Sequence, residues 1–235
     1  MNCEQPSSEE LPAIEIPLER VAKFMRQISH DVRNNLGSMD LQAAYVTELV
    51  TDSDVTAELR KMRGMISSTA KALQNISRSF QFPKPQPLTL SARILLEDFC
   101  ERMTRQHPEE AARIAWEMKL GEEEVAVDIE LIFGALLEFC QNAISFHEGK
   151  TPVRALVAAR DGRLLFEVTQ SRKTVDEAIE EWGRHPLLST RRGGYGLGLF
   201  HARQVIDAHG GRLAFSHCPE KGEVLTRLEI PLVGQ

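Results

Sequence analysis

The sequence predicts an α+β protein in which an N-terminal antiparallel helical hairpin forms a dimeric four-helix bundle and a C-terminal α/β sandwich follows it. Two long segments carry apolar residues at helical spacing, a proline-rich stretch comes next, and helix and strand patterns alternate beyond it. These patterns divide the 235-residue chain into a disordered or extended tail at 1–15, a hairpin at 16–82, a linker at 83–89 and a second domain at 90–235.

The first predicted helix carries an apolar seam at alternating spacings of four and three, as in a packed bundle. The seam consists of Val21, Met25, Ile28, Val32, Leu36, Met39, Ala43, Val46 and Val50. At about 100° per residue, His30 lies roughly 200° around the helix from Ile28. His30 is therefore expected on the exposed side.

The second predicted helix has the same kind of seam, made by Leu59, Met62, Ile66, Thr69, Leu73, Ile76 and Phe80. Between the helices, "VTDSDVT" has turn chemistry, and Asp52, Ser53 or Asp54 can cap the second helix. A lone hairpin buries too little apolar surface. We therefore expect two copies to form a homodimer through Val21–Val50 and Leu59–Phe80.

The composition limits the other possibilities. A hydrophobic content of 42% is normal for a globular protein, and 28 Lys and Arg against 34 Asp and Glu offer no broad basic surface for nucleic acid. No apolar run approaches the roughly 20 residues of a membrane span, and the acidic N-terminus does not read as a signal peptide. We expect a cytoplasmic protein without a membrane span. Its four scattered cysteines, Cys3, Cys100, Cys140 and Cys218, are expected to be reduced and mostly structural.

The linker "FPKPQPLTL" has three prolines, which disfavour helix. A helix around Leu90–Arg105, a strand "RIAWEMKL" and a helix within "VDIELIFGALLEFCQNAISFHE" are expected after it. The strands "VRALVAA" and "LLFEVTQ" follow, joined by a tight Asp161-Gly162 turn. A last helix within "GGYGLGLFHARQVIDAH" stops at Gly210-Gly211, before the strands "GRLAFSH" and "GEVLTRLEIPL". Mainly antiparallel strands with helices on one face of the sheet are predicted.

Glu138 and Asn142 are four residues apart and so share one helix face. Together they can hold a hydrated magnesium ion, with the amide oxygen of Asn142 as a ligand and Glu138 as a proton acceptor or outer partner. The alternative is a polar helix edge that faces solvent.

A glycine-rich stretch precedes the last predicted helix and includes Gly193, Gly194, Gly196 and Gly198. Glycines let the backbone approach a ligand closely, and a helix start presents unpaired N–H groups to an anion. The stretch can therefore cradle phosphate. Glycines that only cap the helix and make turns are the alternative.

In this order along one chain, the hairpin with its exposed His-Asp, the proline linker, Glu-x-x-x-Asn and Gly-x-Gly-x-Gly resemble the core of a bacterial sensor histidine kinase, from about Arg20 to Val233. The resemblance implies a phosphotransfer hairpin and an ATP-binding domain of the kind shared with gyrase and heat-shock chaperones. "LLSTRRGGYGLGLFHARQVIDAHGG" is similar to the end of the ATP lid and the second glycine box. The resemblance implies a catalytic role for Glu138, a magnesium ligand in Asn142, and nucleotide contacts by Asn142, Gln170, Gly194, Gly196, Leu197, Gly198 and Leu199.

The resemblance also gives roles to the residues around His30, which would take a phosphoryl group from ATP onto a ring nitrogen. Asp31 would accept or orient the imidazole proton, so that the other nitrogen can attack. Asn34 falls where phosphatase-active relatives position water, and Asn35 replaces the usual proline, which implies a straighter helix. The alternative is that His30 is a solvated helix residue.

One motif departs from the family. Where relatives carry Asp-x-Gly-x-Gly to bind adenine, this chain has Gln170, Arg172 and Thr174 at the three positions. Gln170 can still accept a hydrogen bond from adenine, but two bulky residues should crowd the pocket floor. Losing a charged hydrogen bond costs about 1.5–3 kcal/mol, so ATP binding is expected to be weak or lost.

The lid before the second glycine box is short. Trp182 and Leu187-Leu188 are candidate apolar anchors that pack it over the pocket, with ordinary packing beneath a loop as the alternative. Tyr195 replaces a small hydroxyl residue and should narrow the phosphate site. Arg191-Arg192 can contact phosphate, or they are simply solvated.

Two functions follow. In the first, a histidine kinase uses ATP to phosphorylate His30 and passes the phosphoryl group to the aspartate of a response-regulator receiver domain. In the second, a histidine phosphotransferase relays phosphoryl groups between receiver domains without ATP. The intact Gly-x-Gly-x-Gly favours the first, and the altered adenine motif favours the second. A pure binding scaffold, in which His30 has no role, is a third possibility.

Overall fold

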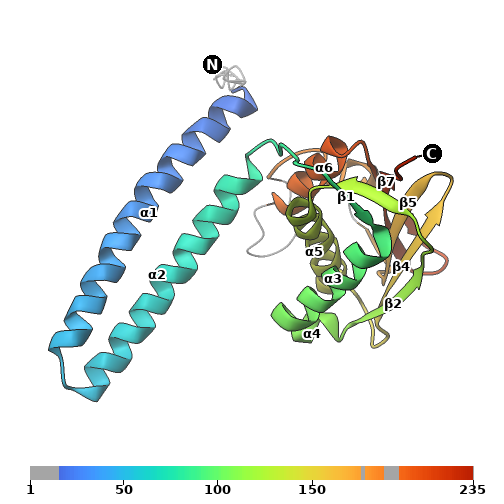
Figure 1. The fold of residues 1–235 in the computed structure, drawn as a ribbon. Helices are drawn as coiled ribbons and strands as arrows, with labels where there is room; N and C mark the ends of the chain where they lie inside the picture. Colours follow the sequence, from blue (N-terminus) through green and yellow to red (C-terminus); the bar gives the residue numbers. More distant parts are fainter. Residues whose placement is uncertain (1–15, 176–177, 188–195, 235) are drawn as a thin grey trace, which may run out of the picture. The chain divides into compact units, whose positions relative to one another are not determined.

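The computed structural model describes residues 16–175, 178–187 and 196–234. The chain divides into two compact units, residues 1–80 and 81–235 (Figure 1). The predicted tail at 1–15 lies outside the described residues, as do Leu188, Arg191-Arg192 and Gly193–Tyr195.

The first unit is an antiparallel pair of long helices, α1 (Leu18–Leu49) and α2 (Ser53–Ser79), which confirms the predicted hairpin (Figure 1). α1 runs without a break through Asn35. At the turn, Asp52 Oδ1 accepts hydrogen bonds from the N–H groups of Asp54 at 2.8 Å and Val55 at 3.3 Å. Asp52 is thus the cap among the three candidates.

The predicted apolar seam is only partly covered within one hairpin. Ala43 and Ile66 are buried between the helices, whereas Ile28, Met39 and Val46 keep 36%, 52% and 38% of their surface exposed. A groove of about 530 Å³ lies between α1 and α2. Its lining includes Leu36, Asp40, Arg60, Arg63, Ile66 and Ala70. Apolar surface of the α1 seam is therefore left for another partner to cover.

The second unit is a sheet with helices on one face (Figure 1). Its strands are β1 (Leu88–Ser91), β2 (Ile114–Lys119), β3 (Glu124–Val127), β4 (Val153–Arg160), β5 (Arg163–Ser171), β6 (Arg212–Cys218) and β7 (Glu223–Pro231). Its helices are α3 (Ala92–Gln106), α4 (Pro108–Ala111), α5 (Ile129–Phe146), the 3-10 helix η1 (Ile179–Glu181) and α6 (Gly198–Ala208). The main sheet has the order β2-β4-β5-β7-β6, and β2–β4 is its parallel pair. This α/β sandwich was predicted.

One segment differs from the prediction. Residues 88–91, expected in part as the start of a helix at Leu90, form β1, which pairs with the unpredicted strand β3. The register joins Leu88 to Val127 and Ser91 to Glu124, so the pairing is long-range and no local helix or turn pattern reveals it. The predicted turn between β4 and β5 is confirmed, with positive φ at both Asp161 and Gly162.

Helix α5 forms the centre of the second unit. By length and composition it could cross a membrane, with a mean hydropathy of 1.3 over 18 residues. Eight of its side chains are buried in the core between α3, α6 and the sheet. This packing accounts for its apolar composition, and the same helix carries Glu138 and Asn142 on another side.

The start of α5 is held by Asp128, which accepts hydrogen bonds from the N–H groups of Leu131 at 3.2 Å and Gln86 at 3.0 Å. The Asp128 N–H itself donates to His209 Nε2 at 3.0 Å, and His209 Nδ1 donates to the Val205 carbonyl at 2.7 Å. His209 thereby joins the end of α6 to the start of α5.

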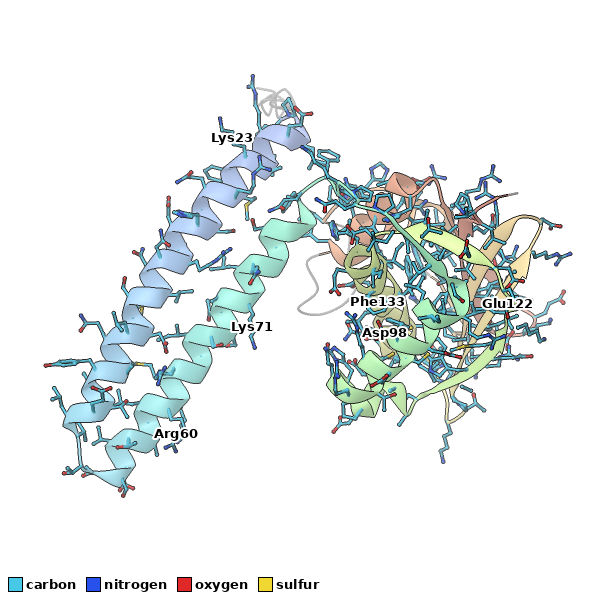
Figure 2. The ribbon with its side chains drawn as sticks, viewed as in Figure 1. Lys23, Arg60, Lys71, Asp98, Glu122 and Phe133 are labelled. Carbon is cyan, nitrogen blue, oxygen red and sulfur yellow. The ribbon has the colours of Figure 1, made fainter. Side chains whose placement is uncertain are left out.

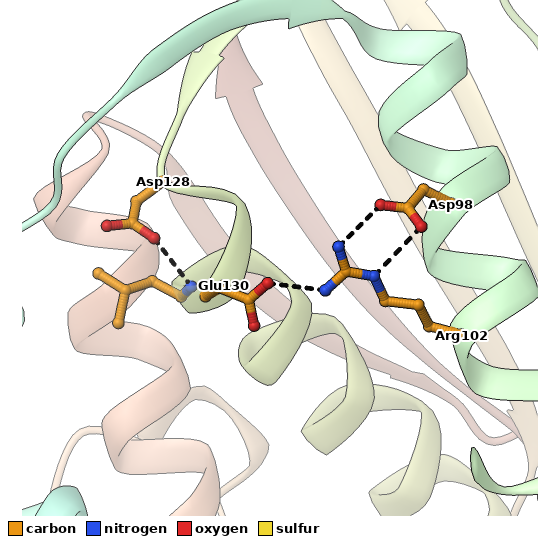
Figure 3. A network of polar contacts seen from close by, with 5 residues as sticks. Asp98, Arg102, Asp128 and Glu130 are labelled. Atoms are coloured by element: carbon orange, nitrogen blue, oxygen red, sulfur yellow. Dashed lines mark hydrogen bonds and ion pairs between the residues drawn. The ribbon is translucent and has the colours of Figure 1, made fainter. Parts of the chain in front are cut away.

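Arg102 joins α3 to α5 (Figure 3). It donates to Asp98 at 3.0 and 3.1 Å and to Glu130 at 2.7 Å. Its guanidinium also lies 4.5 Å from the ring centroid of Phe133, the labelled core residue of α5 in Figure 2. The first turn of α5 is therefore fixed from both sides.

The described cysteines are free thiols. Burial raises the pKa of Cys100 to about 11 and also raises that of Cys140, so both stay protonated near neutral pH. This agrees with a structural role, and Cys3 lies outside the described residues.

Candidate functional site

His30 stands on the exposed side of α1, where its distance from the seam predicted it. Its side chain is 68% exposed, and its Nδ1 lies 3.1 Å from Asp31 Oδ1. Gln27 Nε2 donates to both carboxylate oxygens of Asp31 at 3.1 Å. The hydrogen bonds from His30 and then Gln27 lower the pKa of Asp31, so this carboxylate stays ionised.

Two neighbours approach the same ring nitrogen and require opposite tautomers. The Asp31 carboxylate requires a proton on Nδ1, whereas Asn34 Nδ2, at 3.4 Å from His30 Nδ1, requires a lone pair there. The Asp31 contact is shorter and charge-assisted, so the Nδ1–H tautomer is favoured. Nε2 then carries the lone pair, and no hydrogen bond joins it to any residue that the structure describes.

In the second unit, Glu138 lies against the start of α6. A Cβ added at Gly198 would overlap the Glu138 carboxylate, so this position needs glycine for close approach. The N-terminus of a helix favours negative charge, which explains an acid at this place. Asn142, one turn further along α5, is half-buried on the same helix face.

The glycines of the second glycine box serve different purposes. Gly196 has φ +63°, which a side chain disfavours, and its carbonyl accepts the Leu187 N–H at 3.0 Å. Leu197 is buried and precedes the first turn of α6, whereas Leu199 is half-buried against the core. Gly194, the remaining predicted phosphate contact, lies outside the described residues.

Gln170 occupies the end of β5, on the face that carries Leu164, Phe166 and Val168 into the core. It is only 3% exposed, and its Nε2 has no hydrogen-bond partner in the described part of the chain. A buried amide without a partner costs free energy, about 1–3 kcal/mol. Its donor group therefore remains available to a ligand.

Arg172, two residues after Gln170, fills a space between two aromatic rings. Its Cζ lies 4.7 Å from the ring centroid of Phe146, at the end of α5, and 5.2 Å from that of Trp182. Its Nε donates to the Thr174 carbonyl at 3.1 Å. The expected crowding is thus due to Arg172, whereas the side chain of Thr174 is exposed and does not contribute.

The lid residues around Trp182 are firmly packed. The Trp182 ring lies 5.6 Å from that of Phe215 on β6, and Arg203 Nη2 donates to the Trp182 carbonyl at 2.9 Å. Gly183 approaches the Leu199 carbonyl so closely that a Cβ would lie 2.8 Å from it. Trp182 is therefore packed against β6 and α6, which agrees both with a lid anchor and with ordinary packing beneath a loop. Leu187 is 63% exposed at φ +69°, so its prediction as an anchor was wrong.

Residues 127–234 match the family of histidine kinase-, DNA gyrase B- and HSP90-like ATPases. The match begins just before α5 and includes Glu138, Asn142, Gln170 and the second glycine box. The helical hairpin of α1 and α2 precedes this ATPase-type domain. The chain therefore has both parts of the core that the sequence predicted, the hairpin and the ATPase-type domain. The second unit belongs to this ATPase family over residues 127–234, and the chain as a whole is similar to histidine kinases.

Curated histidine kinases match most of this chain. The sensor histidine kinase ZraS of Salmonella typhi is 25% identical over 214 residues, or 88% of this chain and 45% of ZraS. The histidine kinase/phosphatase NtrB of Salmonella typhimurium is 23% identical over 220 residues, covering 88% of this chain and 62% of NtrB. The chain thus spans about half of the length of the curated relatives it matches.

Solved structures agree with the fold. Full-length ShkA in complex with AMPPNP matches with a TM-score of 0.72 and 19% identity, over 90% of this chain and 46% of that one. The catalytic domain of the histidine kinase ThkA matches with a TM-score of 0.52 and 22% identity, over 62% of this chain and 95% of that one.

Two contributors to this histidine kinase-like site were missed in the sequence. Phe146 lies four residues after Asn142 and so shares its helix face, a signal that could have been found. Arg203, which holds Trp182, had no such signal, because its contacts to Trp182 and Leu213 join separate elements.

Proposed function

We propose that this protein acts in two-component signalling, accepting a phosphoryl group on His30 and transferring it to the aspartate of a response-regulator receiver domain. The observation that carries the proposal is the His30–Asp31 pair. Asp31 binds the proton on Nδ1, and the lone pair of Nε2 faces solvent on an exposed helix side. A neutral, oriented imidazole of this kind is a competent nucleophile for phosphorus.

The transfer needs two displacements. Nε2 attacks phosphorus, the bond from phosphorus to the donor's leaving oxygen breaks, and the proton stays at Nδ1 beside Asp31. A receiver carboxylate then attacks the same phosphorus and the P–N bond breaks, which returns neutral His30. Asp31 stabilises the positive charge that the ring gains in phosphohistidine.

The elements for a nucleoside triphosphate fit in part. Asn142, Glu138, Gly196 and the first turn of α6, which begins at Gly198, retain the features expected for magnesium and phosphate. The base position does not fit, because Arg172 lies between Phe146 and Trp182 where the motif of relatives has glycine. The histidine kinase activity implied by the family is thus proposed with weak nucleotide binding.

A second candidate is favoured by that same observation. If Arg172 keeps nucleotide out, His30 serves as an ATP-independent phosphotransferase that receives its phosphoryl group from one phosphorylated receiver and gives it to another. Nothing in the hairpin distinguishes the two candidates, since both use the same nitrogen of His30.

We further propose that the protein works as a homodimer in the cytoplasm, without nucleic acid as a partner. The exposed seam residues Ile28, Met39 and Val46 support the dimer, since a second hairpin would cover them. The net charge of −6 supports a protein partner over nucleic acid.

The deciding experiment supplies phosphoryl groups in two ways, from labelled MgATP and from a phosphorylated receiver domain. Wild-type protein should gain acid-labile label from at least one donor, and His30→Gln should gain none. Label from ATP supports the kinase, and label only from the receiver supports the phosphotransferase.

His209→Gln is the matched control, because both ring nitrogens of His209 are used inside the fold. It should label like wild type if it remains folded. Equal label on wild type and His30→Gln would refute the proposal.

A further inference from the structure

The space between Phe146 and Trp182 has the character of a stacking site for a flat group. Phe146 lies one helical turn from Asn142, so the slot adjoins the residue expected at the magnesium ion. Trp182 closes the other side and is itself fixed by Phe215 and Arg203. The two ring centroids lie 4.7 and 5.2 Å from the Arg172 guanidinium carbon, and aromatic faces at such distances suit a flat group such as a guanidinium or a nucleic-acid base.

Gln170 is a buried polar residue close in sequence to Arg172 in the slot. It lies on the inward face of β5, two residues before Arg172, which follows the end of the strand, and its buried Nε2 is unpartnered among the described residues. An amide can pair with the edge of adenine by accepting one hydrogen bond and donating another. The unpartnered donor of Gln170 can make such a hydrogen bond with a ligand that reaches it.

We propose that Arg172 occupies the place where a nucleotide base would stack between Phe146 and Trp182, so that a purine nucleotide binds only when Arg172 is displaced. The proposal deepens the proposed function, because it rests on the nucleotide site of the ATPase-type domain. It makes Arg172, rather than the loss of an acid at Gln170, the main barrier to nucleotide binding.

The physical reason is direct competition. Each cation–π contact of Arg172 is favourable, and the base has to replace both. Removing the guanidinium should therefore raise nucleotide affinity about 10-fold or more. If Arg172 instead contacted phosphate, its removal would take away a positive charge and lower the affinity, so the two roles predict opposite signs.

The test is calorimetric titration of MgADP and MgATP into wild type, Arg172→Ala and Arg172→Lys. Arg172→Ala should bind at least 10-fold tighter than wild type. Arg172→Lys keeps the charge but loses the flat guanidinium, so it should also gain affinity. Equal or weaker binding by folded Arg172→Ala would overturn the proposal.

Two controls isolate the base. Arg154→Ala removes an equivalent charge from β4, where Arg154 pairs with Glu223 at 2.8 Å outside the slot, and its affinity should match wild type. Magnesium tripolyphosphate has no base, so its affinity should be the same for Arg172→Ala as for wild type. A gain for tripolyphosphate as large as that for ATP would contradict displacement by the base.

A second measurement uses the wild-type protein, in case Arg172→Ala fails to fold. The Nε–H resonance of Arg172 should be shifted by the currents of both rings, and titration with MgADP to millimolar concentration should move it towards an exposed arginine. If shifts of other resonances show that nucleotide binds while the Nε–H resonance of Arg172 does not move, the proposal is refuted. Arg172→Gln then replaces Arg172→Ala in the titration.

The outcome is separable from that of the proposed function. Tight nucleotide binding by Arg172→Ala with no label on His30 from any donor would leave this inference standing and contradict phosphotransfer. If His30 gains label from a receiver domain but removing Arg172 does not raise nucleotide affinity, phosphotransfer stands and this inference is contradicted.

Discussion

His30 and His209 carry the same ring in opposite situations. His209 uses both nitrogens within the fold, accepting from the Asp128 N–H and donating to the Val205 carbonyl. His30 has one nitrogen beside Asp31 and the other directed to solvent on an exposed helix. The sequence could separate the two because the helical seam places His30 outside the packing, whereas His209 falls at a helix end.

Asp31→Asn should slow phosphorylation of His30 by about 10²–10⁴-fold at pH 7, the usual contribution of a positioned acid–base group. An amide can still contact Nδ1 but cannot stabilise the positive ring. The rate of label uptake from a phosphoryl donor measures the effect.

Asn34→Ala is the matched control for this rate, since its 3.4 Å contact requires the disfavoured tautomer. Phosphorylation should remain within a few-fold of wild type. Equal rates for Asp31→Asn and wild type would show that Asp31 does not assist His30.

The stacking partners of Arg172 could not be predicted from the sequence. The replaced glycine was visible, and crowding was expected from Arg172 and Thr174 alike. The stacking partners Phe146 and Trp182 come from α5 and from the lid, and only the fold brings them to one guanidinium.

At the scale of elements, the joint between α5 and α6 holds the site in position. Glu138 lies against the first residue of α6, and Asp128 and His209 connect the opposite ends of the two helices. The helices themselves followed from apolar periodicity. The pairing of β1 with β3 did not, because both strands have only four residues and their partners are distant in sequence.

Asp128→Ala should lower the free energy of unfolding by about 1–2 kcal/mol at pH 7, because the cap of α5 is lost. The hydrogen bond from Gln86, with further backbone donors and His209, lowers the pKa of Asp128 in the folded state. Its contribution is thus present above the ordinary aspartate pKa and is lost as pH falls through the lowered folded value. Denaturant unfolding at pH 7 and pH 3 measures both effects.

Asp128→Asn serves as the control for charge, since asparagine also caps helices well. Its stability should fall less on acidification than that of wild type. If the stability of wild type and that of Asp128→Asn depend on pH in the same way, the ionised Asp128 carboxylate does not contribute the proposed stability.

At the scale of the whole molecule, the hairpin has more apolar surface than one copy buries. The sequence predicted a seam on both helices, and the structure divides it into a part covered within the hairpin and an exposed part. Which residues fall in each part depends on how the two helices rotate against each other, and periodicity does not fix that rotation.

Met39→Asp should convert a dimer to a folded monomer, because it places a charge in the exposed part of the seam without disturbing the buried Ala43 and Ile66. Light scattering gives the mass and circular dichroism the helix content. Ser68→Asp adds the same charge on the exposed side of α2 and should remain dimeric. A dimeric Met39→Asp would contradict assembly through this seam.

The position of the phosphoryl group on the His30 ring tests the central claim most directly. Phosphorylated protein with ¹⁵N-labelled histidine distinguishes the two isomers by the coupling between phosphorus and each ring nitrogen. Because Asp31 holds the proton on Nδ1, phosphorus should be coupled to Nε2 of His30 alone. Phosphorus bonded to Nδ1, or to any other histidine, would contradict the account.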